Sequence, residues 1–256
     1  MAIDLDLLLR AYASGIFPMS DARDDPDTFW IEPERRAILP LDGLRLSHSL
    51  AKTIRQDRFR VTTDTVFDRV IATCAETAAD RSDTWINPDI EDAFSALHRM
   101  GRAHSVECWQ GDALVGGLYG LELGGAFCGE SMFSRATDAS KVALAWLVAR
   151  LRHGGYRLLD CQFMTDHLAS LGAIEISQQD YMERLEAALG RDYQVSIVCS
   201  SAGSSSSSAA GAGAGFAAGD WGALDGFLSA PSSAGLADGS SSSPGKLILH
   251  SLTHTS

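Results

Sequence analysis

The chain has 256 residues, a formal net charge of −12 and a hydrophobic fraction of 45%. These values are typical of a globular protein with one large domain or two small ones, and the negative charge argues against bulk, non-specific binding to nucleic acid. No apolar run is long enough to span a bilayer, and the acidic N-terminus lacks the basic start of a signal peptide, so we expect a cytoplasmic protein without membrane contact.

The cysteines form an odd, scattered set without a C-x-x-C pair: Cys74, Cys108, Cys128, Cys161 and Cys199. Scattered cysteines in a cytosolic chain are usually reduced thiols, whereas structural zinc sites use closely spaced pairs. We therefore expect neither a disulfide framework nor a bound metal, and we expect no cofactor.

Residues 1–60 are expected to form a small N-terminal domain. A short amphipathic helix is predicted over residues 4–14 and ends at "SGIFP", and Ser47 or Ser49 can cap a basic helix. After the strand-like "FRVTTD", Asp64 stands where it can cap a helix with apolar residues at helical spacing. Pro88 suits the first turn of the next helix.

Between residues 103 and 134 the apolar pattern changes, and three successive strands are predicted. They are "AHSVECW", "ALVGGLYGLEL" and "GAFCGESMF", separated by "QGD" and by Gly124-Gly125, which are hairpin turn signals. A helix capped by Asp138, the strand "YRLLDCQF" and a helix over about residues 178–189 follow. We therefore predict an α+β protein whose second domain, residues 61–195, has a mixed, largely antiparallel sheet.

Residues 196–256 are expected to be a tail rich in Ser, Gly and Ala. "SAGSSSSSAAGAGAG" cannot bury enough apolar surface to offset its ordering entropy, so it is predicted to be a flexible linker. "GKLILHSLTHTS" regains strand character and could dock on the sheet.

Positive charge is concentrated between residues 35 and 60. Seven basic residues stand there against two acidic ones, a local net charge of +5: Arg35, Arg36, Arg45, Lys52, Arg55, Arg58 and Arg60 against Asp42 and Asp57. A solvated helix face and a phosphate-binding patch both explain such a run.

Three polar residues interrupt strands that are otherwise apolar. Because side chains alternate along a strand, Asp160 and Gln162 should share one face of their strand, and Glu130 should share a face with Cys128 and Met132. Each carboxylate alone could be satisfied by backbone amides or by an arginine. Two carboxylates and an amide on neighbouring strands favour a functional site.

Three antiparallel strands, a helix and a further strand are the core order of GNAT-type acyltransferases. In members that use coenzyme A, a glycine-rich loop holds the pyrophosphate at the start of that helix. The corresponding junction here, "SRATDASK", contains no glycine. An acyltransferase with this sequence would therefore need another acyl donor.

The chain resembles the leucyl/phenylalanyl-tRNA–protein transferase family over about residues 7–190. The segments that carry the resemblance are, in order, "SGIFPM", "TWI", "AHSVECW", "LVGGLYG", "FCGESMFSR", "ASKVAL", "LLDCQ" and "DHLASLGA". The resemblance implies transfer of leucine or phenylalanine, with methionine as a further candidate, from aminoacyl-tRNA to the N-terminal amine of proteins that begin with Lys or Arg. The product of this reaction is an N-degron, a signal for protein degradation.

The resemblance assigns the catalytic pair to Asp160 and Gln162. A Gln162 amide oxygen polarised by Asp160 can orient the attacking amine, and whether Asp160 also takes a proton is left open. Glu130 would bind the positive N-terminal residue of the acceptor.

The resemblance also implies an apolar pocket for the transferred amino acid and contacts with tRNA. The pocket residues would be Leu118, Phe127, Met132, Leu144, Leu147 and Leu159, each of which could equally be ordinary core. Trp30 and Trp85 would hold the terminal adenosine by stacking, and the acceptor-stem phosphates would meet Arg45, Lys52, Arg55 and Arg58. For tryptophans the alternative is a place in the core.

Two other functions remain open from the sequence. The first is an N-acyltransferase of the same fold that acts on a small molecule, which coenzyme A binding would support. The second is a tRNA-binding module without catalysis, which the intact "DCQ" argues against.

Overall fold

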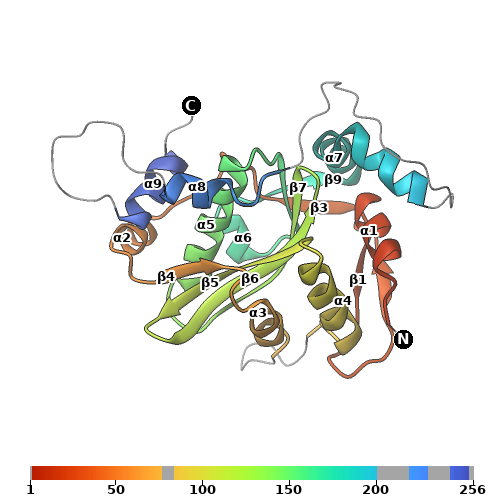
Figure 1. Ribbon diagram of the computed structural model, residues 1–256, viewed down its shortest axis with the longest axis horizontal. Helices are drawn as coiled ribbons and strands as arrows, with labels where there is room; N and C mark the ends of the chain where they lie inside the picture. Colours follow the sequence, from red (N-terminus) through yellow and green to blue (C-terminus); the bar gives the residue numbers. More distant parts are fainter. Residues whose placement is uncertain (1, 77–83, 201–218, 230–242, 254–256) are drawn as a thin grey trace.

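A mixed sheet of seven strands runs through the centre of the protein (Figure 1). The computed structural model describes residues 2–76, 84–200, 219–229 and 243–253, with the backbone alone over 191–200. The strands of the sheet are β3 (Arg35–Ile38), β4 (Arg60–Thr63), β5 (Ala103–Gln110), β6 (Ala113–Leu123), β7 (Ala126–Ser134), β8 (Leu158–Gln162) and β9 (Ile174–Ser177). Their order in space is β4-β5-β6-β7-β8-β3-β9.

The predicted α+β class and the largely antiparallel sheet are confirmed. β7 and β8 are parallel, joined by α5 (Ala139–His153), and the other pairs in the sheet are antiparallel. Gly111 and Gly124 adopt positive φ angles of 59° and 57° in the two tight turns between β5, β6 and β7, a conformation that glycine adopts without strain. Local turn chemistry therefore accounts for the meander.

Helices cover both faces of the sheet, each over its own hydrophobic core (Figure 1). One core takes residues from α1 (Leu5–Ala13), α3 (Phe67–Cys74), α4 (Pro88–Arg99) and α7 (Gln178–Ser200). The other takes residues from α5, α2 (His48–Arg55), α6 (Asp166–Ser170), α8 (Ala223–Ser229) and α9 (Pro244–Thr253). Neighbouring residues of β6 face opposite cores, Leu118 the second and Tyr119 the first, as strand alternation requires.

A separate two-stranded sheet near the N-terminus joins β1 (Phe17–Met19) to β2 (Phe29–Ile31). The boundary expected at residue 60 does not separate packing units, because β3 lies between β8 and β9 in the main sheet. The reason is that β3 finds its partners more than 100 residues away, on strands whose pairing local sequence cannot predict.

Of the predicted helix starts, those at Ser47 and Pro88 are confirmed, Asp138 takes the N-cap position of α5 without a side-chain cap bond, and the one at Asp64 is wrong. Ser47 accepts a hydrogen bond from the backbone N–H of Leu50 at the start of α2, and Pro88 opens α4. Asp64 does not cap α3, which starts later at Phe67 without a side-chain cap. The Asp64 carboxylate instead accepts hydrogen bonds from the Ser105 backbone N–H and from the side chain of Trp221.

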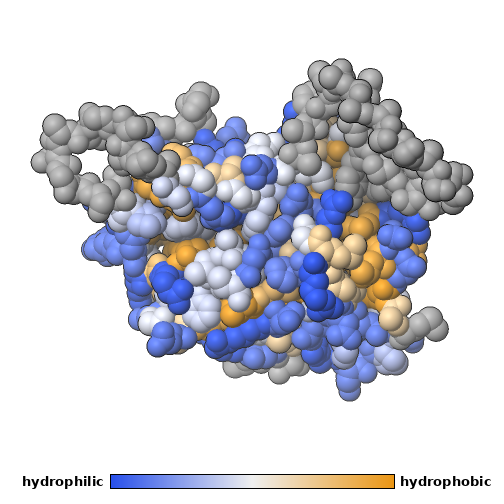
Figure 2. All heavy atoms as spheres, in the orientation of Figure 1, coloured by the Kyte–Doolittle hydropathy of each residue, from blue (hydrophilic) through white to orange (hydrophobic). Residues whose placement is uncertain are grey.

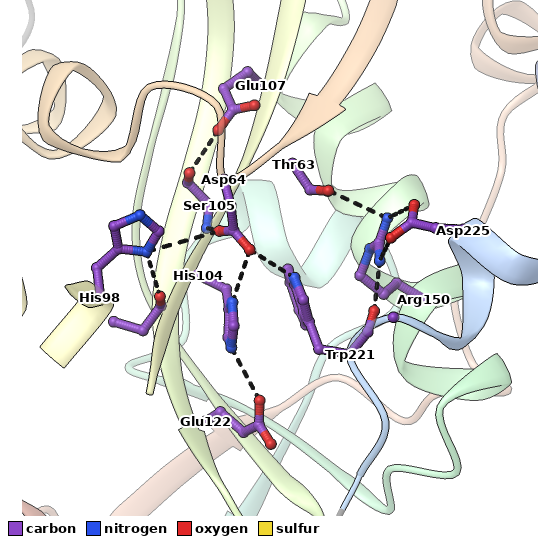
Figure 3. Close-up of polar contacts among 12 residues, drawn as sticks. Thr63, Asp64, His98, His104, Ser105, Glu107, Glu122, Arg150, Trp221 and Asp225 are labelled. Carbon is purple, nitrogen blue, oxygen red and sulfur yellow. Dashed lines mark hydrogen bonds and ion pairs between the residues drawn. The ribbon is translucent and has the colours of Figure 1, made fainter. Parts of the chain in front are cut away.

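The described residues near the C-terminus dock as the two helices α8 and α9, and residues 245–253 are helical where we predicted a strand. Ile248 and Leu249 of α9 are buried in the core that contains α2 and α5, because a helix places these neighbours on one wide apolar face. Trp221, just before α8, stacks on the ring of His104 with centroids 4.2 Å apart (Figure 3). The predicted linker "SAGSSSSSAAGAGAG" lies outside the described residues.

Hydrophilic side chains cover most of the face seen in Figure 2, with hydrophobic residues in smaller groups between them. Scattered exposed apolar residues are normal for a folded chain whose cores are buried. Among the described helices, none combines the length and the apolar character that crossing a membrane would need.

Candidate active site

A cavity of about 280 Å³ opens on the α5 side of the sheet, just below the range of about 300–1,000 Å³ for ligand pockets. Five of the six residues predicted for the aminoacyl pocket line it: Leu118, Met132, Leu144, Leu147 and Leu159. The wall also includes Glu130 and Gln162, so polar groups and an apolar surface meet in one place. Asp160 lies behind this wall.

Phe127, the sixth residue predicted for the pocket, is not among the residues that line the cavity, so the structure does not bring it together with the other five. Its ring is fully buried and stacks on the indole of Trp221, with centroids 5.5 Å apart. The C-terminal segment provides this partner, and no periodic pattern near Phe127 could have indicated it.

A β-bulge in β7 shapes the wall of the cavity. Gly120 pairs with Gly129 and Tyr119 pairs with Ser131, so Glu130 is the extra residue. The bulge moves Met132 to the core opposite the one that Cys128 joins, and the prediction that these two residues share a face with Glu130 is therefore wrong.

Glu130 is buried at the cavity wall, with 7% of its surface exposed. Its Oε1 accepts a 2.9 Å hydrogen bond from Nε2 of Gln162, whereas its buried Oε2 accepts none of good geometry from any described residue. Burial raises the pKa of Glu130 to about 8, although the Tyr12 hydroxyl and Gln162 oppose this shift. A carboxyl group with a free, buried oxygen beside a cavity is suited to receiving a positively charged ligand.

Gln162 has an unusual backbone conformation for a residue with a side chain, with a φ of 59°. A β-bulge at Cys161 precedes it, since Ala37 pairs with Gln162 and Ile38 with Asp160. The backbone N–H of Gln162 donates to Oδ1 of Asp160 over 2.9 Å. Left-handed conformations of non-glycine residues are sparsely populated and cluster at functional sites.

Asp160 is fully buried and reaches Gln162 through the backbone, not through the side-chain amide that we expected. Arg36 binds both of its oxygens, from Nε to Oδ1 over 2.9 Å and from Nη2 to Oδ2 over 2.6 Å. The Tyr181 hydroxyl donates to Oδ2 over 3.1 Å. The arginine partner considered as an alternative for a buried carboxylate is thus present beside the candidate site.

Arg36 and Tyr181 are the site residues that sequence reasoning missed. Arg36 was counted as part of the basic stretch, but it is 1% exposed and pairs with Asp160. Arg36 lies directly before the buried run Ala37–Leu39, but the neighbouring Arg35 is exposed, so the sequence carries no signal that separates the two arginines.

Only one of the two predicted adenosine-binding tryptophans reaches the cavity. Trp85 lines it, and its backbone carbonyl is held by the hydroxyl of Ser20 over 2.9 Å. Trp30 lies on β2, 39% exposed, opposite Pro18 and outside the cavity lining.

The four residues predicted to contact tRNA phosphates lie on the surface of α2 and the adjoining loops: Arg45, Lys52, Arg55 and Arg58. None of them forms an ion pair with a carboxylate in the described part of the chain. Elsewhere in the basic stretch, Arg35 pairs with Glu175 over 3.1 Å. Two of the seven basic residues, Arg35 and Arg36, are thus already paired with carboxylates.

The start of α5 differs from an anion cradle. Asp138 stands at the N-cap position of α5, where its carboxylate would repel a bound anion. Gly116 of β6 packs directly against the first residue of this helix, Ala139. A Cβ at Gly116 would lie 2.5 Å from the Cβ of Ala139, so glycine is needed for this close approach. No three described side chains gather as metal ligands would.

Comparison with known proteins agrees with the resemblance seen in the motifs. The family model described as leucyl/phenylalanyl-tRNA protein transferase matches residues 38–186, and the model of that family's N-terminal domain matches residues 1–34. A protein of this name from Rhizorhabdus wittichii is 62% identical over 230 residues, 90% of each chain. One from Novosphingobium aromaticivorans is 51% identical over 259 residues, 100% of this chain and 97% of the relative. The chain therefore belongs to the leucyl/phenylalanyl-tRNA–protein transferase family and is an aminoacyltransferase.

Proposed function

We propose that this chain transfers leucine or phenylalanine, with methionine as a further candidate, from aminoacyl-tRNA to the N-terminal amine of proteins that begin with Lys or Arg. The observation that carries the proposal is the hydrogen bond between Gln162 and Glu130 on the wall of an apolar cavity. The reaction belongs in the cytoplasm, where charged tRNA is available, and its products carry an N-degron.

The donor side chain enters the cavity between β6, β8 and α5. Leu118, Met132 and Leu144 offer apolar surface there, and the unbranched Met132 can adapt to both a leucine and a phenylalanine side chain. Trp85 at the same cavity is available to stack on the terminal adenine. The exposed cations on α2 and the adjoining loops bind the phosphates of the acceptor stem. Trp30, which lies outside the cavity lining, is a second residue that could stack on a base.

The acceptor is held by Glu130 and oriented by Gln162. Because Nε2 of Gln162 donates to Glu130, its Oε1 is left to accept a hydrogen bond from the neutral N-terminal amine. The amine nitrogen forms the new C–N bond to the ester carbonyl, the ester C–O bond breaks, and a proton from the amine ends on the departing ribose oxygen. The ester is already activated, so positioning accounts for most of the rate.

The deciding experiment is transfer of labelled leucine from Leu-tRNA to a peptide that begins with Lys or Arg. Gln162→Ala and Asp160→Ala should each lower turnover by about 10²-fold or more, with aminoacyl-tRNA affinity nearly intact. Wild-type turnover in both variants would remove this pair from the mechanism.

The same assay separates the two other functions. Transfer from coenzyme A thioesters without transfer from tRNA would identify a different N-acyltransferase, which the acidic N-cap of α5 disfavours. Retained tRNA binding with no transfer would identify a binding module.

A further inference from the structure

The buried ion pair between Arg36 and Asp160 lies behind the cavity, and no step of the proposed reaction uses Arg36. The Arg36 guanidinium donates from Nη1 to the carbonyl of Gly15 over 2.9 Å and from Nη2 to the Tyr181 hydroxyl over 3.4 Å, besides its two bonds to Asp160. Burying a charge is costly unless it is paired and hydrogen-bonded, and here both conditions are met.

Two aromatic rings fix the orientation of the guanidinium. Its carbon lies 4.6 Å from the ring centroid of Phe17 and 4.5 Å from that of Tyr181. Cations attract the faces of aromatic rings, and a planar guanidinium stacks where an ammonium would not. Arg36 therefore packs against Phe17 on β1 and Tyr181 on α7 while it binds Asp160 on β8.

Asp160 has no free acceptor position left for a substrate. Oδ1 accepts from Nε of Arg36 and from the Gln162 backbone N–H, and Oδ2 accepts from Nη2 of Arg36 and from the Tyr181 hydroxyl. Two carboxylate oxygens offer about four lone-pair sites in all. Since all of them are used and Asp160 is fully buried, this carboxylate is not placed to take a proton from the amine.

We propose that Arg36 is a positioning residue that acts on the reaction through Asp160 and the backbone of Gln162. The guanidinium of Arg36 fixes the carboxylate of Asp160, and Oδ1 of Asp160 accepts a hydrogen bond from the backbone N–H of Gln162. This hydrogen bond holds Gln162 in its left-handed backbone conformation, which directs the side-chain amide toward Glu130. Asp160 thus orients Gln162 and transfers no proton. The proposal rests on the role of Gln162 given under the proposed function.

The test uses the full chain in the leucine-transfer assay. Arg36→Lys keeps the charge and removes the fork, and it should lower kcat at least tenfold while the KM values for aminoacyl-tRNA and acceptor change less than threefold. The matched control is Arg35→Lys, the neighbour on β3, whose exposed pair with Glu175 lies away from the cavity; its kcat should equal that of the wild type. Wild-type kcat in folded Arg36→Lys would overturn the proposal.

A double-mutant cycle distinguishes action through Asp160 from an independent effect. In an Asp160→Asn background, Arg36→Lys should cost less than twofold in kcat, because the carboxylate that it fixes is already gone. Equal tenfold losses in both backgrounds would overturn the proposal.

Should Arg36→Lys fail to fold, Tyr181→Phe carries the test, because it keeps the stacked ring and removes only the hydroxyl, which donates to Oδ2 of Asp160 and accepts from Nη2 of Arg36. It should lower kcat about threefold to tenfold at unchanged KM, and wild-type kcat would overturn the proposal. A wild-type chain that transfers no amino acid would instead reject the proposed function.

Discussion

At the scale of single residues, Glu130 explains how a carboxyl group persists inside an apolar strand. Burial raises its pKa to about 8, so the group is mainly protonated at pH 7 and avoids most of the cost of a buried charge. A cation that enters the cavity would favour the ionised form. Acceptor binding should therefore be coupled to loss of a proton.

We predict that a peptide with an N-terminal arginine displaces this proton on binding. Near pH 7 the wild type should release close to one proton more than Glu130→Gln, and its acceptor affinity should rise with pH up to about 8 and then level off. Calorimetry in buffers of different ionisation enthalpy measures the difference, and the peptide amine, which also titrates, cancels between the two proteins. Equal proton release from both would show that Glu130 does not meet the cation.

At the scale of elements, the bulge in β7 decides which side chains form the cavity. By inserting Glu130, it turns Met132 toward Leu118 on β6, whereas strict alternation would have turned it away. The shape of the cavity is therefore a product of strand pairing as well as of composition.

Leu118→Trp should reduce the use of Phe-tRNA more than that of Leu-tRNA, because the larger side chain occupies space that an aromatic ring needs. Competition between the two charged tRNAs measures the ratio. Phe127→Leu is the control: Phe127 packs against Trp221 outside the cavity lining, so the ratio should stay at its wild-type value. An unchanged ratio in Leu118→Trp would place this residue outside the pocket.

Helix α2 and the cavity should make different kinds of contact with tRNA. Neutralising Arg55 and Arg58 together should weaken binding and flatten its salt dependence, since phosphate contacts release counterions. Trp85→Ala should cost about 1–3 kcal/mol, typical of one stacking contact, and leave the salt slope unchanged.

A short aminoacylated 3′-end analogue provides the control, because it lacks the stem. The loss in Trp85→Ala should persist with this analogue, whereas the loss from the two arginines should largely disappear. Equal losses for both ligands in both variants would mean that the basic stretch is only a solvated surface.

At the scale of the whole molecule, residues 219–229 tie the end of the chain to the sheet through a cluster around His104 (Figure 3). The ring of His104 lies between Asp64, 2.8 Å from Nδ1, and Glu122, 3.0 Å from Nε2, and stacks on Trp221. His98 lies 3.9 Å from Asp64 on the other side. Although burial alone would lower it, the pKa of His104 is raised by these two carboxylates.

The stability of the protein should therefore depend on the charge of His104. Because the pKa of His104 is higher in the folded state than in the unfolded state, its stabilisation is complete at pH values below the unfolded pKa of about 6.5. The stabilisation is lost as the pH rises through the pKa of the folded state. Burial would raise the pKa of Asp64, but the bonds from His104 lower it, so its own contribution is lost only in acid.

The free energy of unfolding of the wild type should exceed that of His104→Gln by more at pH 6 than at pH 9. Denaturant unfolding at both values measures this, with His250→Gln, an exposed histidine of α9, as the control. A difference that stays constant with pH would show that His104 contributes by packing alone.

The sequence by itself determined the order of the central elements and singled out three polar residues that lie together in the structure. Turn glycines, helix caps and strand alternation depend on near neighbours, so the meander β5-β6-β7, α5 and β8 could be predicted. The "FCGESMFSR" and "LLDCQ" motifs likewise named Glu130, Asp160 and Gln162, and the structure brings these three together.

Only the tertiary structure decided how the site is held. Arg36 and Asp160 are 124 residues apart, and no local pattern distinguishes Arg36 from the exposed Arg35 beside it. Side-chain alternation along a strand fails where a bulge inserts a residue, which is why the face predicted for Met132 was wrong. The apolar run in α9 suits a strand as well as a helix, and packing against α2 and α5 selects the helix because burial stabilises one face of it.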